Sequence, residues 1–163
     1  MIIKLKNKDT LIINDFKLKC CIGRGGIKKN KIEGDGATPK GKFTLGNLYW
    51  RADKVEKPTT NLKCKKIKKY IGWCTDAKSE SYNREFKINK NFKYEKLLRN
   101  DNKYNYLIVI NYNRKNIIKN KGSAIFIHLT KNYKPTAGCI ALNKKDFLIF
   151  SKLVNKKSKI LIS

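Results

Sequence analysis

Short apolar runs, interrupted by Gly, Asn, Asp or Pro, recur along this 163-residue chain. β-branched and aromatic residues are prominent in these runs, which favours strands over helices because such side chains pack well on a pleated surface. The pattern therefore predicts a mainly β core. The expected strands are 10–13, 17–23, 42–49, 106–112, 124–129, 138–142 and 159–162.

Two short helices are expected beside these strands. One covers 94–99, and a better-defined one covers 144–154, where Asn143 is placed to cap the first turn and Asp146 lies within it. The other polar stretches are weakly patterned, and we expect them to be surface loops. They are 63–69 and 79–93.

The length fits a single domain, expected to span 1–163, since no repeat or Pro- or Ser-rich linker divides the chain. Hydrophobic residues make up 40%, which argues against disorder despite 31% charged residues. No run approaches the roughly 20 apolar residues of a membrane-spanning helix. The first nine residues mix apolar and charged types, so we expect no cleaved leader.

The formal net charge of +27 predicts attraction to a polyanion such as nucleic acid, an acidic membrane surface or an anionic cell-wall polymer. Only five of the 39 basic residues are Arg, and no nucleic-acid-binding motif is present, so no specific nucleic-acid partner is expected. Lys, Asn and Ile are also the residues of AT-rich codons. The charge therefore has two explanations, a polyanionic partner or compositional drift.

The chain has one histidine, His128, and five cysteines, of which no two form a CxxC pair. No metal or other cofactor is expected from that set. An odd number of cysteines leaves at least one thiol outside any intramolecular disulfide. The cysteines are Cys20, Cys21, Cys64, Cys74 and Cys139.

Residues 124–142 indicate a strand, a loop containing a proline, and a second strand. If the two strands pair as an antiparallel hairpin, His128 and Cys139 become neighbours. An imidazole can accept the proton of a thiol, whose pKa is otherwise about 8.5, and so make it nucleophilic. Gly138 lets the backbone turn closely, so the N–H groups of Gly138 and Cys139 are candidate donors to an oxyanion.

A structural interpretation of the same residues stays open. A cysteine beside Ile140 is often a small core residue, and a histidine at a strand end is often a satisfied structural one. The position of the only His opposite a Gly-Cys turn favours catalysis. Segment 34–43 by itself predicts a tight turn and lacks the GK[ST] of a phosphate-binding loop.

Together these segments resemble the L,D-transpeptidase catalytic-domain (YkuD-like) family. His128, Thr136, Gly138 and Cys139 match the family's His, then Ser or Thr, one residue, and Gly-Cys, and 36–41 is similar to its upstream Thr-Pro-x-Gly segment. The resemblance runs from about 21 to 162. Stretches typical of one branch of the family are 72–74, 82–84, 122–126 and 138–142.

The resemblance implies a β-sandwich or open barrel with one or two short helices. It also implies an enzyme that attacks the bond between the diamino residue and D-Ala in a peptidoglycan stem peptide. Cys139 would form a thioester and pass the acyl group to an amine, making a 3-3 cross-link, or to water, as an L,D-carboxypeptidase. The alternative from another class is a non-catalytic basic module that binds an anionic polymer.

Further candidates for substrate binding are Thr136, by the resemblance, and Tyr82, Asn83 and Arg84, because an arginine among lysines can fork onto a carboxylate. An equally open interpretation of 82–84 is a structural loop anchor.

The resemblance implies the cell envelope as the location. The absent leader leaves three explanations: a start further upstream, unconventional export, or action on cytoplasmic precursors. Many family members have His before Gly-Cys and Asn or Arg two residues after Cys, where this chain has Ala137 and Ala141. The group that orients His128 is therefore open, with a backbone carbonyl as the expected candidate.

Overall fold

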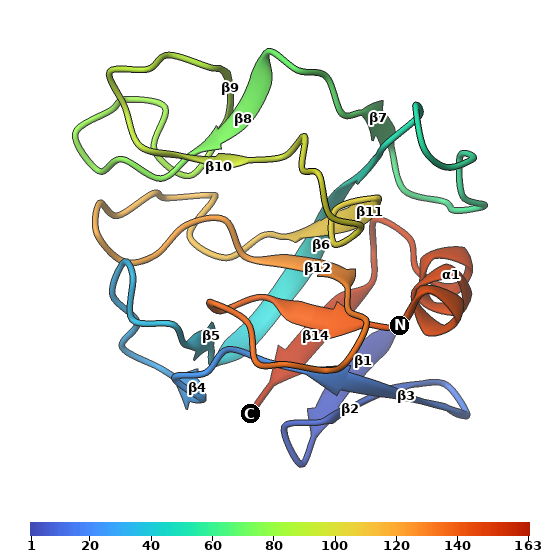
Figure 1. The fold of residues 1–163 in the computed structure, drawn as a ribbon. Coiled ribbons are helices and arrows are strands. Elements are labelled where there is room, and N and C mark those ends of the chain that lie inside the picture. Colours follow the sequence, from blue (N-terminus) through green and yellow to red (C-terminus); the bar gives the residue numbers. More distant parts are fainter.

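Eight strands form a closed barrel in the computed structural model, which describes all 163 residues (Figure 1). They are β1 (Ile2–Lys6), β2 (Thr10–Ile13), β3 (Phe16–Cys21), β6 (Gly41–Trp50), β11 (Tyr106–Ile110), β12 (Phe126–Leu129), β13 (Ile140–Leu142) and β14 (Lys159–Ile162). The order around the barrel is β11, β12, β13, β3, β2, β1, β14 and β6, and β6 pairs with β11 to close it. The barrel is mixed, because β12 pairs with β13 and β1 with β14 in parallel. The predicted mainly β fold is confirmed.

All seven predicted strands are present, and two of them start later than expected. β12 begins at Phe126 and β13 at Ile140. Residues just before them have positive φ, +55° at Ala124 and +139° at Gly138, which interrupts an extended strand. Of these two residues, Ala124 lines the cavity described below, and Gly138 directly precedes Cys139.

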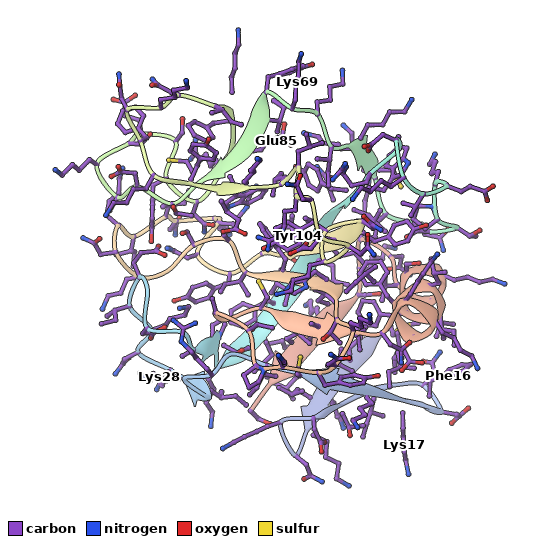
Figure 2. All side chains as sticks on the ribbon, viewed as in Figure 1. Phe16, Lys17, Lys28, Lys69, Glu85 and Tyr104 are labelled. Atoms are coloured by element: carbon purple, nitrogen blue, oxygen red, sulfur yellow. The ribbon has the colours of Figure 1, made fainter.

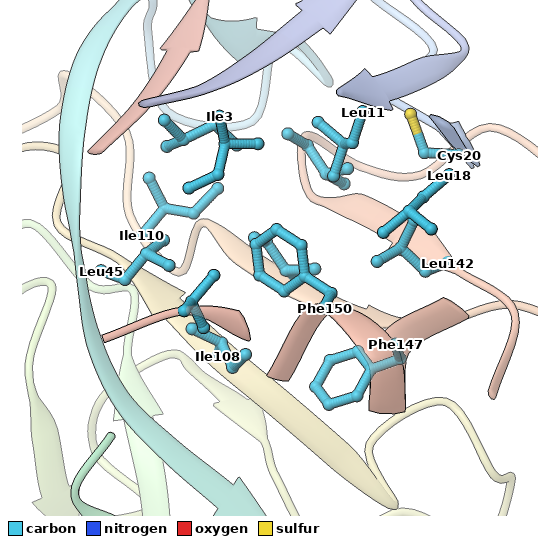
Figure 3. Packing of buried hydrophobic residues seen from close by; sticks show 14 of the residues in the cluster. Ile3, Leu11, Leu18, Cys20, Leu45, Ile108, Ile110, Leu142, Phe147 and Phe150 are labelled. Carbon is cyan, nitrogen blue, oxygen red and sulfur yellow. The ribbon is translucent and has the colours of Figure 1, made fainter. Parts of the chain in front are cut away.

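The barrel encloses a core of 24 buried apolar residues (Figure 3). Strand β1, which the sequence pattern does not predict, contributes Ile3 and Leu5 to this core. These two residues alternate with exposed ones. Burial of such side chains stabilises the fold by about 2 kcal/mol each. Phe147 and Phe150 from the helix enter the same core, so the helix is packed against the barrel rather than standing apart.

The predicted C-terminal helix is confirmed as α1 (Lys144–Leu153) at one side of the barrel (Figure 1). The Asn143 side chain accepts a hydrogen bond from the Asp146 N–H at 2.8 Å, as a capping residue should. This helix has ten residues, and no helix of the structure is long and apolar enough to cross a membrane.

The second predicted helix, 94–99, is wrong. Tyr94–Lys96 forms β10, which pairs antiparallel with β8 (Ile71–Cys74), and β8 also pairs with β9 (Glu85–Lys87). The segment is too short to hold a helix alone, and pairing with β8 satisfies its backbone groups instead. These strands form a small sheet at the end of the molecule opposite β2 and β3 (Figure 1).

The two stretches expected to be surface loops contain short strands. β7 (Cys64–Lys66) runs parallel to β6, and β9 lies in the second. A further pair, β4 (Ile27–Lys28) and β5 (Thr38–Pro39), holds the turn-rich segment 27–39 together. Strands of two or three residues cannot be predicted from the sequence because they are too short to show the alternation of apolar and polar residues.

Candidate active site

Strands β12 and β13 lie side by side but run parallel, so the expected antiparallel hairpin is wrong. The register pairs Ile127 with Ile140 and His128 with Ala141. The loop between the strands returns along β3: the Thr136 N–H donates to the Ile22 carbonyl at 2.9 Å, and β13 then pairs with both β12 and β3. The loop has enough residues to carry the chain back to the starting end, which parallel pairing requires.

His128 and Cys139 nevertheless belong to one face of this strand pair. Side chains alternate between faces, so His128 shares its face with Ala141 and, two residues earlier, with Cys139. That diagonal corresponds to about 8 Å between Cα atoms. Both side chains line the same cavity of about 730 Å³. The two residues therefore share one face and one cavity through a parallel pairing instead of the expected hairpin.

A backbone carbonyl orients His128. Its Nδ1 lies 2.9 Å from the Leu129 carbonyl oxygen, which only accepts hydrogen bonds, so Nδ1 carries the proton and Nε2 keeps a lone pair. The Tyr104 ring packs edge-on against the imidazole at 5.2 Å between centroids (Tyr104 is labelled in Figure 2). Burial lowers the pKa of His128 from 6.5 to about 4, so the imidazole is neutral at neutral pH.

Two backbone groups hold the Cys139 thiol. It donates to the Ala124 carbonyl at 3.4 Å, and its sulfur accepts from the Phe126 N–H at 3.3 Å. Burial raises the pKa of Cys139 from 9.0 to about 12, against a smaller lowering by the Phe126 N–H. The cavity thus contains a neutral thiol and a neutral imidazole rather than an ion pair.

The turn before Cys139 is fixed by two threonines. Thr136 Oγ1 donates to the Cys139 carbonyl at 2.6 Å and accepts from the Gly138 N–H at 3.1 Å. Thr38, from the upstream segment, donates to the Gly138 carbonyl at 2.9 Å. A Cβ at Gly138 would lie 2.8 Å from the Ala37 carbonyl oxygen, so only glycine fits this close approach at φ +139°.

The two expected oxyanion donors differ in availability. The Gly138 N–H is engaged by Thr136, whereas the Cys139 N–H has no acceptor within the chain. An unengaged N–H at the nucleophile itself is suited to a developing oxyanion. Cys139 is therefore the donor that the geometry leaves available.

Residues 82–84 lie outside the lining of the cavity. The Tyr82 hydroxyl donates to Glu33 and accepts from the Gly122 N–H, and Asn83 Oδ1 accepts from the Ala124 N–H at 3.1 Å. Both side chains are buried and anchor the segment that receives the Cys139 thiol. Arg84 is exposed and is not among the residues that line the cavity.

Charged side chains of both signs line the cavity. Lys31, only 3% exposed, pairs with Asp35 at 2.6 Å, and Arg99 pairs with Asp101 at 2.6 Å. Glu33 and Glu95 are the two acidic residues of the lining. The six basic residues are Arg24, Lys31, Arg99, Lys103, Lys131 and Lys134.

Several of these residues carried no recognisable signal in the sequence. Tyr104 contacts His128 from a segment preceding β11, and Ala124 and Leu129 act through carbonyls, which every residue type has. Lys31 and Arg24 resemble any basic residue of this chain until the fold brings them to the cavity. No group of three His, Cys, Asp or Glu side chains comes together in the structure.

The arrangement brings together a thiol, a neutral imidazole held in one tautomer, and a polar cavity on a mixed β-barrel. These are the parts that acyl transfer through a thiol requires. The family model of the L,D-transpeptidase catalytic domain (YkuD) matches residues 3–162, nearly the whole chain, and the chain belongs to this family. No curated protein matches the chain. Membership implies L,D-transpeptidase-type activity on peptidoglycan.

Proposed function

We propose that the chain acts as one catalytic unit, a cysteine acyltransferase on the stem peptides of peptidoglycan. The observation that carries the proposal is that Cys139 and His128 line one cavity while Nδ1 of His128 is committed to the Leu129 carbonyl. That commitment leaves Nε2 as the base. Membership in the family supports the stem peptide as substrate.

In the first step, Cys139 Sγ attacks the carbonyl carbon of the diamino residue, and the thiol proton passes to Nε2 of His128. Both groups start neutral, so transfer accompanies attack instead of preceding it. The Cys139 N–H donates to the oxyanion. The C–N bond to D-Ala then breaks, the leaving amine takes the proton from the imidazolium, and a thioester remains.

In the second step, an amine or a water molecule attacks the thioester and gives a proton to Nε2. The S–C bond breaks and the thiol is restored by the imidazolium. An amine of another stem yields a 3-3 cross-link, and water yields a trimmed stem, the L,D-carboxypeptidase outcome. The same residues serve both reactions, so the acceptor decides the product.

The cell envelope is the proposed place of action, since the substrate lies there. The lysine-rich surface supports association with an anionic cell-wall polymer, because 39 basic residues face only 12 acidic ones. Lys17, Lys28 and Lys69 illustrate how widely these charges are spread over the periphery (Figure 2).

The test is intact-protein mass spectrometry after incubation with a stem tetrapeptide ending in D-Ala. The wild type should gain the mass of the tripeptidyl group, with release of D-Ala, and Cys139→Ala should gain none while keeping its fold. Cys64→Ser is the matched control, because Cys64 is more exposed than Cys139 and lies outside the cavity. Undiminished labelling of Cys139→Ala would defeat the assignment of Cys139 as the nucleophile, whereas no labelling of the wild type would leave the non-catalytic binding module as the better description.

A further inference from the structure

A free carboxylate lies close to the bond that is broken in such a substrate. In a peptide whose last residue leaves, the terminal carboxylate carbon is three bonds from the attacked carbonyl carbon, about 3 to 4 Å away. Wherever Cys139 attacks, that carboxylate must therefore enter the same cavity. A cation that lines the cavity and is not already neutralised would hold it.

Partners within the chain exclude two of the six basic residues. Lys31 is buried against Asp35 at 2.6 Å, and Arg99 is bound to Asp101 through two nitrogens. The lysines at the cavity are exposed, as Arg24 is, but each ends in a single ammonium on a flexible stem instead of a planar fork. They are Lys103, Lys131 and Lys134.

Arg24 remains, and its side chain packs against Gly36. A Cβ on Gly36 would lie 3.0 Å from Cγ and 3.4 Å from Cζ of Arg24, so the side chain lies directly over the Gly36 backbone. Arg51, Arg99 and Arg114 each have an intramolecular partner, whereas none is found for the Arg24 guanidinium.

The backbone of Arg24 is tied to the turn that carries the nucleophile. Its N–H donates to the Thr136 carbonyl at 2.9 Å, and Thr136 Oγ1 in turn donates to the Cys139 carbonyl. The preceding Gly23 packs so closely on this turn that a Cβ there would lie 2.9 Å from Cα of Gly138. The backbone of Arg24 is thus fixed relative to the turn that carries the thiol, and Arg24 lines the same cavity.

We propose that Arg24 binds the terminal carboxylate of the leaving residue and makes the protein selective for stems that end in a free acid. This inference rests on the proposed function. An unpaired planar guanidinium can take both carboxylate oxygens, which lysine cannot. The sequence suggested Arg84 as the arginine that binds the substrate carboxylate. Arg24 lines the cavity and Arg84 does not, so we assign this role to Arg24.

The test compares a tetrapeptide ending in D-Ala with the same peptide ending in D-Ala carboxamide. For the wild type, the second-order rate of acylation should be about 10- to 100-fold lower with the amide, the usual worth of a charge-assisted hydrogen bond. Arg24→Gln should lose a similar factor with the acid and nothing further with the amide. Arg24→Lys should lie between.

Lys17→Gln controls for the loss of one charge away from the cavity, and Arg84→Gln tests the rival arginine. Equal losses of Arg24→Gln on acid and amide would overturn the assignment, as would an acid-selective loss in Arg84→Gln. Calorimetric binding of both peptides to Cys139→Ala, with and without Arg24→Gln, separates the two proposals. Acid-selective binding that depends on Arg24 without any wild-type acylation would sink the proposed function alone, and binding indifferent to Arg24 would sink this inference alone.

Discussion

The two faces of β12 and β13 share one backbone and differ in what they can do. One face is purely aliphatic and belongs to the large core; its residues are Ile127, Leu129, Ile140 and Leu142. The opposite face carries His128 and Cys139 into the cavity. Both faces are buried, so the difference between them is chemical rather than a difference in exposure.

The comparison teaches that burial has opposite consequences on the two faces. On the aliphatic face it stabilises the fold by removing apolar surface from water. On the cavity face it raises the pKa of Cys139 and lowers that of His128, so that both groups stay neutral. In the proposed mechanism, this is the state from which a single proton transfer starts the reaction.

The largest effect is expected on the cavity face. His128→Gln removes the base, and acylation of Cys139 by stem tetrapeptide should slow by about 10³-fold. Rapid-quench mass spectrometry measures the rate, and circular dichroism checks that the fold is intact. An acylation rate within twofold of the wild type would show that the thiol does not depend on this imidazole.

On the aliphatic face the effect should fall on stability instead. Ile140→Ala, fully buried in the core, should lower the free energy of unfolding by about 3 kcal/mol, because the cavity left behind adds to the lost transfer energy. Urea denaturation measures it. Leu161→Ala, on a half-buried position of β14, is the milder control. The acylation rate per folded molecule should stay at the wild-type value. A clearly lower rate in Ile140→Ala would mean that the two faces do not act separately.

A smaller effect is expected in how the stability of the fold depends on pH, because only the cavity face carries groups with shifted pKa values. The folded pKa of His128, about 4, lies below the 6.5 of the free group, so the unfolded state binds more protons and stability is lost as pH falls from 6.5 toward 4. Cys139 works in the other direction, with stability lost as pH rises from 9.0 toward 12.

The histidine contribution amounts to about 2 to 3 kcal/mol. Urea midpoints between pH 4 and 7 should therefore change less with pH in His128→Gln than in the wild type, whereas Ile140→Ala should keep the wild-type dependence. Parallel curves for wild type and His128→Gln would mean that His128 is not buried in the neutral form.

Sequence patterns were informative where a local rule applies. Asn143 and Asp146 specify the start of α1 through contacts within one turn, and alternating apolar residues specify the long strands. The helix predicted for 94–99 was wrong because the segment pairs with β8, which lies some twenty residues earlier in the chain. The register and direction of β13 could not be predicted from the sequence for the same reason, since they depend on β3 as well as β12.

The sequence by itself determined the mainly β class and the capped helix, and it singled out the only histidine and the cysteine of the Gly-Cys turn, which line one cavity. Only the tertiary structure decided that these strands run parallel, that the Leu129 carbonyl orients the imidazole, and that Arg24 rather than Arg84 enters the cavity. The physical reason is that residue type sets what a side chain can do, whereas long-range strand pairing sets what it meets.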